Sequence, residues 1–312
     1  MNTFTKRLLT GAIILTVIVA AFCLKIWVFS FFMDALILFV SVMALIEVGR
    51  AVTPRFAKPL YFIVFAHLFL SYALIVIGRH TEWTWLITRT GSRYSTLLYT
   101  SIELPAVFIV MLISAFFFKR VTFPRIVSTA FLLFYPTILL IFLLSLNNIV
   151  PINFADAHAD AIDFSVFGMV ALFAVSLCSD TFAYLVGMTV KGPKLCPNLS
   201  PKKTVSGAAG GLLGGVIGAM AAYLLFKYGL PGYAPKMPDG AALPLFHYFI
   251  IGILGSVFTQ AGDLAASYIK RYCEIKDYSN VFPGHGGFMD RLDGMIFNSV
   301  FVYFYLMIII GI

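Results

Sequence analysis

Long apolar runs separated by short polar connections set the pattern of this chain. A helix needs roughly 20 apolar residues to cross the hydrocarbon core of a bilayer. Runs of about this length lie approximately at residues 8–24, 26–48, 59–78, 98–118, 126–147, 163–189, 207–228, 246–269 and 294–311. The pattern therefore predicts an all-α integral membrane protein, a polytopic bundle of about nine transmembrane helices.

The connections between the apolar runs leave no room for a separate soluble domain. The longest lie around residues 79–97, 190–206, 229–245 and 270–293. We therefore expect a single membrane domain over residues 1–312. Residues 1–147 are mostly apolar and are interpreted as a helical scaffold, whereas residues 148–312 contain the polar clusters that suggest chemistry.

Composition and charge support a membrane location. The chain is 61% hydrophobic and 12% charged, against about 25% charged residues in an ordinary soluble domain. If the N-terminus is cytoplasmic, 16 of the 22 lysines and arginines fall in cytoplasmic connections, as the positive-inside rule requires. The net charge of +8 is then explained by topology and contact with anionic lipids, not by nucleic-acid binding.

The four cysteines form no C-x-x-C pair, so neither a zinc site nor a disulfide framework is indicated.

Charges of both signs gather in the stretch from Asp263 to Asp293, which the topology places on the cytoplasmic side. Its acidic residues are Asp263, Glu274, Asp277, Asp290 and Asp293, and its basic residues are Lys270, Arg271, Lys276 and Arg291. A glycine-rich turn, Pro283–Gly287, precedes the last two aspartates. Carboxylates are hard oxygen ligands suited to Mg²⁺, and the lysines and arginines can meet the phosphates of a substrate. A juxtamembrane cluster of salt bridges is the alternative.

Helical spacing puts further polar residues on common faces. Asp263 and Lys270 are seven residues apart, so they share one face of the run that ends near residue 269. In the run at 163–189, Asp180, Tyr184 and Gly187 share a face in the same way. A carboxylate at membrane depth costs about 2.5–3.5 kcal/mol and usually faces a cavity or a partner. Asp180 therefore either lines a functional cavity or belongs to a structural ion pair.

The connection before the run at 207–228 reads Ser200-Pro201-Lys202-Lys203-Thr204. Ammonium and hydroxyl groups near the start of a helix suit an anion such as a phosphate. Positive-inside bias alone also predicts lysines at this place, so both interpretations stay open. The glycines that follow form two rows at helical spacing: Gly207, Gly211 and Gly215, and Gly210, Gly214 and Gly218. Such rows favour close helix packing over a nucleotide-binding loop, and they give a weak reason to expect a homodimer.

Isolated polar residues elsewhere receive structural interpretations. Glu47 and Arg50 are spaced for an ion pair at a cytoplasmic helix end. Asp34 lies near the start of the second run, where it would reach the outer interface, and His67 is interpreted as a packing residue. The acidic residues between 148 and 163 are interpreted as a solvated surface loop, with a metal site as the alternative.

The run S-Y-I-K-R-Y-C-E-I-K-D-Y-S-N-V-F-P-G-H-G-G-F-M-D-R-L-D, Ser267–Asp293, closely resembles the C-terminal pattern of phosphatidate cytidylyltransferases (CDP-diacylglycerol synthases). That pattern is S-x-x-K-R, a gap, K-D, a gap, P-x-H-G-G and then D-R-x-D. The filled positions are Ser267, Lys270, Arg271, Lys276, Asp277, Pro283, His285, Gly286, Gly287, Asp290, Arg291 and Asp293. The runs Asp180–Gly187, Ser200–Thr204 and Gly262–Leu264 also resemble family features, so the resemblance covers residues of about 175–298.

The resemblance implies a multi-pass enzyme of the cytoplasmic membrane that joins CTP to phosphatidate, with its active site facing the cytoplasm. Asp263, Asp290 and Asp293 would hold Mg²⁺ and act in catalysis with Lys270 and Arg271, while Asp180 would line the cavity or hold a second cation. The residues implied in substrate and phosphate binding are Ser200, Lys202, Lys203, Thr204, Ser267, Lys276, His285, Gly286, Gly287 and Arg291.

Ser206 departs from the family pattern, which usually has a glutamate before the glycine found here at position 207. The missing carboxylate implies altered surroundings of the site, an altered efficiency or a modified lipid preference.

Two other functions remain as alternatives. One is a CTP-dependent polyprenol or lipid kinase. The other, from a different class, is a membrane transporter, which would be expected to show inverted repeats.

Overall fold

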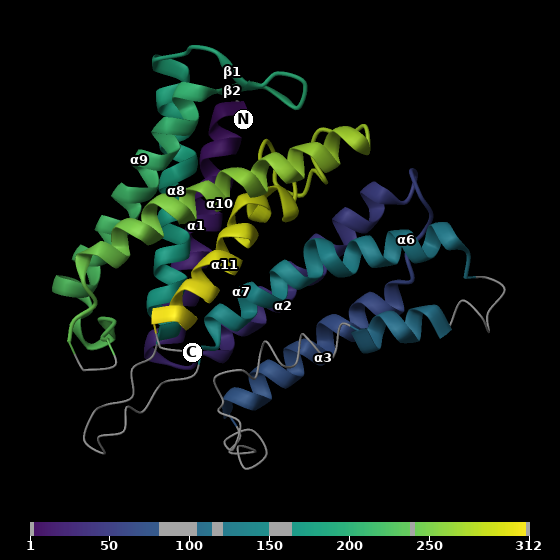
Figure 1. Cartoon of the computed structure of the whole chain (residues 1–312), viewed down its shortest axis with the longest axis horizontal. Helices are drawn as coiled ribbons and strands as arrows, with labels where there is room; N and C mark the ends of the chain where they lie inside the picture. The colour runs from purple at the N-terminus through teal and green to yellow at the C-terminus, as the bar shows by residue number, and fades with distance from the viewer. Residues whose placement is uncertain (1–2, 81–104, 114–120, 150–163, 238–240, 310–312) are drawn as a thin grey trace. The chain divides into compact units, whose positions relative to one another are not determined.

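A computed structural model describes residues 3–80, 105–113, 121–149, 164–237 and 241–309 (Figure 1). Within these ranges, seven helical segments are long and apolar enough to cross a membrane. Five are single helices: α1 (Thr3–Trp27), α2 (Phe31–Val52), α8 (Phe164–Thr189), α10 (Leu245–Tyr272) and α11 (Met289–Ile309). The other two combine α6 (Phe123–Leu132), η2 (Leu133–Thr137) and α7 (Ile138–Asn147), and α9 (Val205–Leu224) with η3 (Leu225–Gly229). The predicted all-α polytopic membrane architecture is therefore confirmed.

Two of the nine expected spans need separate comment. The run at 59–78 forms α3 (Tyr61–His80), whose apolar part, Tyr61–Val76, is shorter than the other spans. The run at 98–118 lies largely outside the described residues, although residues 105–113 are helical. Of the acidic segment at 148–163 that was expected to be a surface loop, residues 150–163, with all of its acidic side chains, also lie outside them.

The described residues cluster into two compact units. Unit 1 contains Met1–Ser145 and Lys270–Leu292, and unit 2 contains Leu146–Ile269 and Asp293–Ile312. The first boundary lies close to residue 147, where the sequence suggested that the scaffold ends. The segment Lys270–Leu292, which contains most of the charged stretch, nevertheless belongs with the scaffold helices of unit 1.

Unit 1 is built around α2, which contacts α1, α3 and α6. Its core includes Ala44, Leu45 and Val48, all fully buried. Asp34 is fully buried as well. This aspartate therefore lies on the protein-facing side of α2, whereas its neighbours Phe31 and Phe32 are exposed, and its predicted place at the outer interface stays a prediction. His67 of α3 is almost fully buried, in agreement with a packing role.

Unit 2 is held together by small residues that let its helices approach closely, and Figure 1 shows α8 and α9 lying side by side. Gly210, Gly214 and Gly218 face α8, and a side chain at Gly215 would collide with α10 at Ser256. The prediction that the glycine rows serve helix packing is confirmed. Both rows are covered by helices of the same chain, so they no longer give a reason to expect a homodimer, which stays an untested prediction.

A hydrogen-bonded polar cluster lies in the interior of unit 2. The Asn298 Nδ2 atom donates to Ser176 Oγ at 2.9 Å, and Ser176 Oγ lies 3.2 Å from Thr259 Oγ1. All three side chains are fully or almost fully buried. Hydrogen bonds between membrane helices contribute about 0.6 kcal/mol each, so the cluster fixes the mutual position of α8, α10 and α11 within this unit.

The polar connection before α9 folds into a short antiparallel hairpin of β1 (Lys194–Cys196) and β2 (Ser200–Thr204). The sequence did not predict these strands. Strand β2 runs directly into α9, and Thr204 is the N-cap residue, whose hydroxyl accepts a hydrogen bond from Gly207 N at 3.1 Å. The hairpin thus presents Lys202 and Lys203 beside the first turn of a membrane helix.

Candidate functional site

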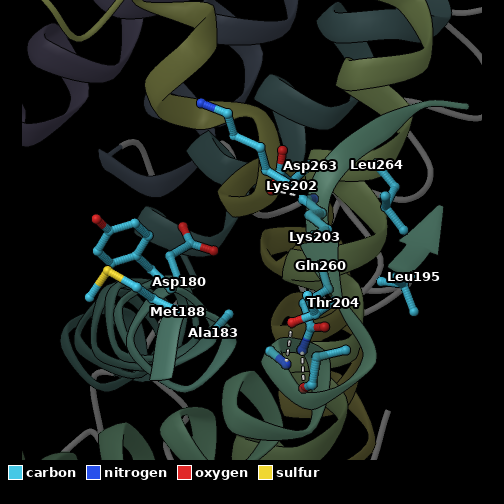
Figure 2. A pocket seen from close by; sticks show the side chains of 14 residues that line it. Asp180, Ala183, Met188, Leu195, Lys202, Lys203, Thr204, Gln260, Asp263 and Leu264 are labelled. Carbon is cyan, nitrogen blue, oxygen red and sulfur yellow. Dashed lines mark hydrogen bonds and ion pairs between the residues drawn. The ribbon is translucent and has the colours of Figure 1, made fainter. Parts of the chain in front are cut away.

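A cavity of about 350 Å³ lies in unit 2 between α8, the β1–β2 hairpin, α9 and α10. Its polar lining is Asp180, Lys202, Lys203, Thr204, Gln260 and Asp263, and its apolar lining includes Tyr184, Met188, Leu195 and Leu264. Figure 2 shows Asp180 and Met188 on one side, with Lys203, Gln260 and Asp263 opposite. Its volume is within the range of small-ligand sites, about 300–1,000 Å³. The mixed lining suits a molecule with a charged end and an apolar end.

The predicted face of α8 lines this cavity. Asp180, Tyr184 and Gly187 are all part of its wall, as their spacing indicated. A side chain at Gly187 would come within 3.0 Å of Thr204 Oγ1, so the glycine lets the hairpin approach α8. The α8 carboxylate and the β2 lysines therefore border one space.

Lys203 and Asp263 form an ion pair across the cavity wall. The Lys203 Nζ atom lies 2.5 Å from Asp263 Oδ2, and the side chains keep 26% and 34% of their exposure. Because both groups reach solvent, the pair contributes about 0–1 kcal/mol to stability. Because the ion pair is weak, a ligand can replace it, and each of the two charged groups is then able to bind the ligand instead.

Ser206 takes part in fixing the hairpin. Its hydroxyl donates to the Lys191 carbonyl and lies 3.1 Å from the Thr204 hydroxyl. The residue that departs from the family pattern is therefore a link between the start of α9 and the loop before β1. A glutamate at this position could not donate such a bond, so the local contacts of this chain differ from those that the family pattern implies.

Gln260 is a cavity residue that sequence reasoning missed. Its Nε2 atom donates to the Ala208 carbonyl at 3.2 Å, which ties α10 to α9. The available signal was its spacing: Gln260 precedes Asp263 by three residues in an otherwise apolar run, so both share one helical face.

Asp290 organises the glycine-rich turn in unit 1. Its Oδ2 atom accepts hydrogen bonds from Tyr278 N at 2.8 Å and from Gly287 N at 3.0 Å. Its Oδ1 atom accepts from Lys270 Nζ at 2.9 Å. The carboxylate side chain is only 3% exposed. A buried charge requires such donors, because desolvation without partners costs several kcal/mol.

Glu47 of α2 binds the same turn. Its Oε1 atom accepts from Ser279 Oγ at 2.6 Å and from Phe288 N at 3.1 Å, and its Oε2 atom accepts from Met289 N at 2.9 Å. The side chain therefore satisfies backbone donors at the start of α11, a place where negative charge is favoured. The predicted ion pair between Glu47 and Arg50 was wrong, because Glu47 faces this turn instead.

The two carboxylates explain the glycines of the turn. Residues 287, 288 and 289 donate consecutive backbone amides to Asp290 and Glu47. A side chain at Gly287 would collide with the Glu47 carboxylate and Ser279, and one at Gly286 would come within 2.7 Å of Asp290 Oδ2. Gly286 also has a φ of 78°, which favours glycine. These glycines therefore allow the turn to close around buried carboxylates.

The other predicted site residues lie outside the cavity lining. Ser200 begins β2 and pairs with Cys196, and Ser267 is half-buried on α10. Arg271 donates to the Ile275 carbonyl at 3.4 Å, and the Asp293 Oδ1 atom accepts from Gly294 N at 2.9 Å. The remaining three are two exposed cations and one half-buried histidine of the turn: Lys276, Arg291 and His285.

The donor set of unit 2 fits a magnesium ion that also binds substrate. Mg²⁺ sites commonly use one or two carboxylates together with water and phosphate oxygens, and Asp180 and Asp263 line one cavity. An ion bound at Asp290 Oδ1 would compete with the Lys270 ammonium for that oxygen. Across the described ranges, no group of three or more His, Cys, Asp or Glu side chains gathers into a metal site.

Comparison with known proteins places the chain among cytidylyltransferases. Residues 5–309 match the model of the Cytidylyltransferase family. A phosphatidate cytidylyltransferase of Aquifex aeolicus is 32% identical over 201 residues, 64% of this chain and 65% of that protein. Those of Brucella abortus and Bacillus subtilis are 37% and 36% identical over 44% and 41% of this chain. The matched parts span 46% and 43% of those two relatives, less than half of their length. Because the family model covers nearly all of the sequence, the chain belongs to the cytidylyltransferase family.

Proposed function

We propose that this protein is a phosphatidate cytidylyltransferase, which converts CTP and phosphatidate into CDP-diacylglycerol and pyrophosphate. The observation that supports this most directly is the unit 2 cavity, which combines lysines, carboxylates and apolar side chains in one wall. Phosphatidate has a matching character, with a phosphate monoester at the end of two acyl chains. Similarity to the relatives with this name supports the same proposal.

The reaction needs no strong protein base. The second pKa of a phosphate monoester is about 6, so phosphatidate is largely a dianion at neutral pH. One of its phosphate oxygens attacks the α-phosphorus of CTP, a new P–O bond forms, and the bond to the β-phosphate oxygen breaks. The electron pair leaves with pyrophosphate. Catalysis then consists of positioning the phosphates and stabilising the charge that develops.

The chain's own cations would hold the phosphates. Lys203 is proposed to leave Asp263 and bind a phosphate oxygen, with Lys202 and Thr204 beside it. Lys270 and Arg271 are proposed as the further phosphate ligands on α10. Asp290 is proposed to keep Lys270 oriented through their ion pair. His285, Lys276 and Arg291 remain predicted substrate contacts.

Magnesium is the proposed cofactor. Bound to Asp263, with Asp293 as a predicted further ligand and Asp180 as a candidate for a second cation, it would neutralise the triphosphate and assist the departure of pyrophosphate. Asp290 was also predicted to be a ligand, but its carboxylate oxygens already bind Lys270 and two backbone amides, so we propose a structural role for it instead. The carboxylates would fix the ion, and the lysines would bind the oxygens that the ion leaves uncovered.

The protein is proposed to lie in the inner (cytoplasmic) membrane, with its active site facing the cytoplasm. The support is the distribution of basic residues, which favours a cytoplasmic N-terminus and places the Asp263–Asp293 stretch on that side. CTP is a cytoplasmic metabolite, so this orientation would bring it directly to the site.

Two forms of labelled CTP test the reaction. Purified protein in phosphatidate-containing detergent micelles with Mg²⁺ should transfer an α-phosphate label to the lipid fraction and release a γ-phosphate label as pyrophosphate. A CTP-dependent lipid kinase would instead place the γ-label on the lipid. Reconstituted protein that moved a solute across the membrane, yet made no CDP-lipid, would favour the transporter.

A further inference from the structure

A second cavity, of about 490 Å³, lies in unit 1 where α2 ends and α3 begins. Two cationic side chains, Arg50 and Lys58, are part of its wall, together with the Tyr61 ring and the apolar side chains of Ile46 and Phe65. None of these residues belongs to the cavity or the turn described above. The composition of the wall is again amphipathic, but here all of its charge is positive.

No acidic side chain of the described residues pairs with the cations of this cavity. Arg50 and Lys58 are both exposed, and neither forms an ion pair with an acidic side chain in the part of the chain that the structure describes. Other cations do have such partners there: Arg55 pairs with Glu274. The nearest candidate for Arg50 on its own helix, Glu47, is committed to the start of α11.

The wall changes from charged to apolar along both helices. Ile46 precedes Arg50 by one turn of α2, and Phe65 follows Tyr61 by one turn of α3. Because α2 is a membrane span that ends at Val52, the cations lie at the membrane surface and the apolar residues lie deeper. Gly49 allows the two helices to meet here, since a side chain at this position would come within 2.8 Å of the Tyr61 ring.

We propose that this cavity is a binding site for an anionic glycerophospholipid. Its phosphate would lie between Arg50 and Lys58, and an acyl chain would follow Ile46 and Phe65 into the membrane. Basic pockets between transmembrane helices bind lipid headgroups through this combination of charge and depth. Its lining shares no residue with the unit 2 cavity, and the lipid bound there is proposed to be a ligand of α2 and α3, not a substrate.

Phosphatidylglycerol is a suitable probe, because its phosphate is a diester and cannot act as the acceptor in the proposed reaction. The full chain in a neutral detergent is titrated with phosphatidylglycerol or phosphatidylcholine, and bound lipid is counted by native mass spectrometry. We expect one saturable phosphatidylglycerol site and no comparable phosphatidylcholine site. In the double variant Arg50→Gln/Lys58→Gln, affinity should fall about thirty-fold, given about 1 kcal/mol for each basic residue at a membrane surface.

Two matched variants control this experiment. Lys227→Gln/Lys236→Gln removes the same charge from exposed positions of unit 2 and should leave binding unchanged. Arg50→Lys/Lys58→Arg preserves the charge and should keep most of the affinity, even if the neutral variant folds poorly. Equal binding by wild type and the neutral variant would overturn the proposal. Complete displacement of the lipid by millimolar inorganic phosphate would also overturn it, because the cavity would then bind a free anion.

Discussion

The unit 2 cavity and the unit 1 turn use the same residue types for different purposes. In the cavity, Asp263 is 34% exposed and contacts one lysine. In the turn, Asp290 is 3% exposed and accepts bonds from one lysine and two backbone amides. A carboxylate of the first kind can exchange its partner for a ligand, whereas one of the second kind maintains the backbone. Burial and the number of donors therefore separate the two roles, although both residues belong to the charged stretch from Asp263 to Asp293.

The largest effect that separates the two regions is expected for Asp263→Asn. Loss of this carboxylate should lower the rate of CDP-lipid synthesis at least a hundred-fold, the usual effect of removing a group that stabilises charge in the transition state. The melting temperature should change little, because the exposed ion pair contributes at most about 1 kcal/mol. A parallel fall in stability and activity would mean that Asp263 is structural, and the contrast with Asp290 would disappear.

Asp290→Asn should act on stability first. The substitution removes the buried negative charge that pairs with Lys270, and it replaces one carboxylate oxygen by an NH₂ group, which cannot accept a hydrogen bond. We therefore expect a loss of about 3 kcal/mol in the free energy of unfolding. Thermal unfolding in detergent measures this loss. The matched control is Asp277→Asn, an exposed carboxylate of the same segment, which should change stability by less than about 0.5 kcal/mol. Equal effects of the two substitutions would contradict the role assigned to Asp290.

Glu47→Gln tests whether the turn depends on the scaffold. A glutamine keeps one acceptor oxygen but places an NH₂ group against a backbone donor at the start of α11, so stability should fall by about 2 kcal/mol. Activity should fall with it, and Glu47→Asp should recover part of both. The control is Glu274→Gln, whose side chain is 79% exposed. If both glutamine variants behave like wild type, the hydrogen bonds of Glu47 are not needed to hold the turn.

The smallest effect concerns thiol reactivity. Burial raises the pKa of the Cys273 thiol in unit 1, and the nearby Arg55 guanidinium partly offsets this. The folded-state pKa of this thiol lies above the ordinary value of about 8.5. The protonated thiol therefore stabilises the folded state below that pH, and this contribution to the free energy of unfolding is lost as the pH rises through the folded-state pKa. At pH 8, a maleimide should therefore modify Cys273 more slowly than the half-exposed Cys196 of β1. Equal rates would show that the segment after α10 is as open as the hairpin.

Much of the fold could be predicted because membrane helices are encoded locally. Apolar runs of sufficient length gave the spans, and helical spacing correctly placed Asp180, Tyr184 and Gly187 on one wall. The hairpin of β1 and β2 was missed because two strands of three and five residues have no detectable periodicity.

The contacts of Glu47 could not be predicted for a different reason. Its spacing to Arg50 offered a plausible partner on the same helix, whereas its actual partners lie 232 to 242 residues further along the chain. Local pattern contains no information about such pairs. The carboxylate is oriented by the buried backbone N–H groups at the start of α11, because these donors need acceptors.

Gly287 makes the residue types allowed at two distant positions of the chain depend on each other. The space beside its α-carbon is filled by the carboxylate of Glu47 and the hydroxyl of Ser279. A larger residue at position 287 is therefore tolerated only if position 47 becomes smaller, and a smaller residue at position 47 leaves backbone amides without acceptors. Changes at positions 47 and 287 should consequently be restricted together among related sequences, so that the apparently plain N-terminal helices carry a constraint imposed by the most distinctive motif of the chain.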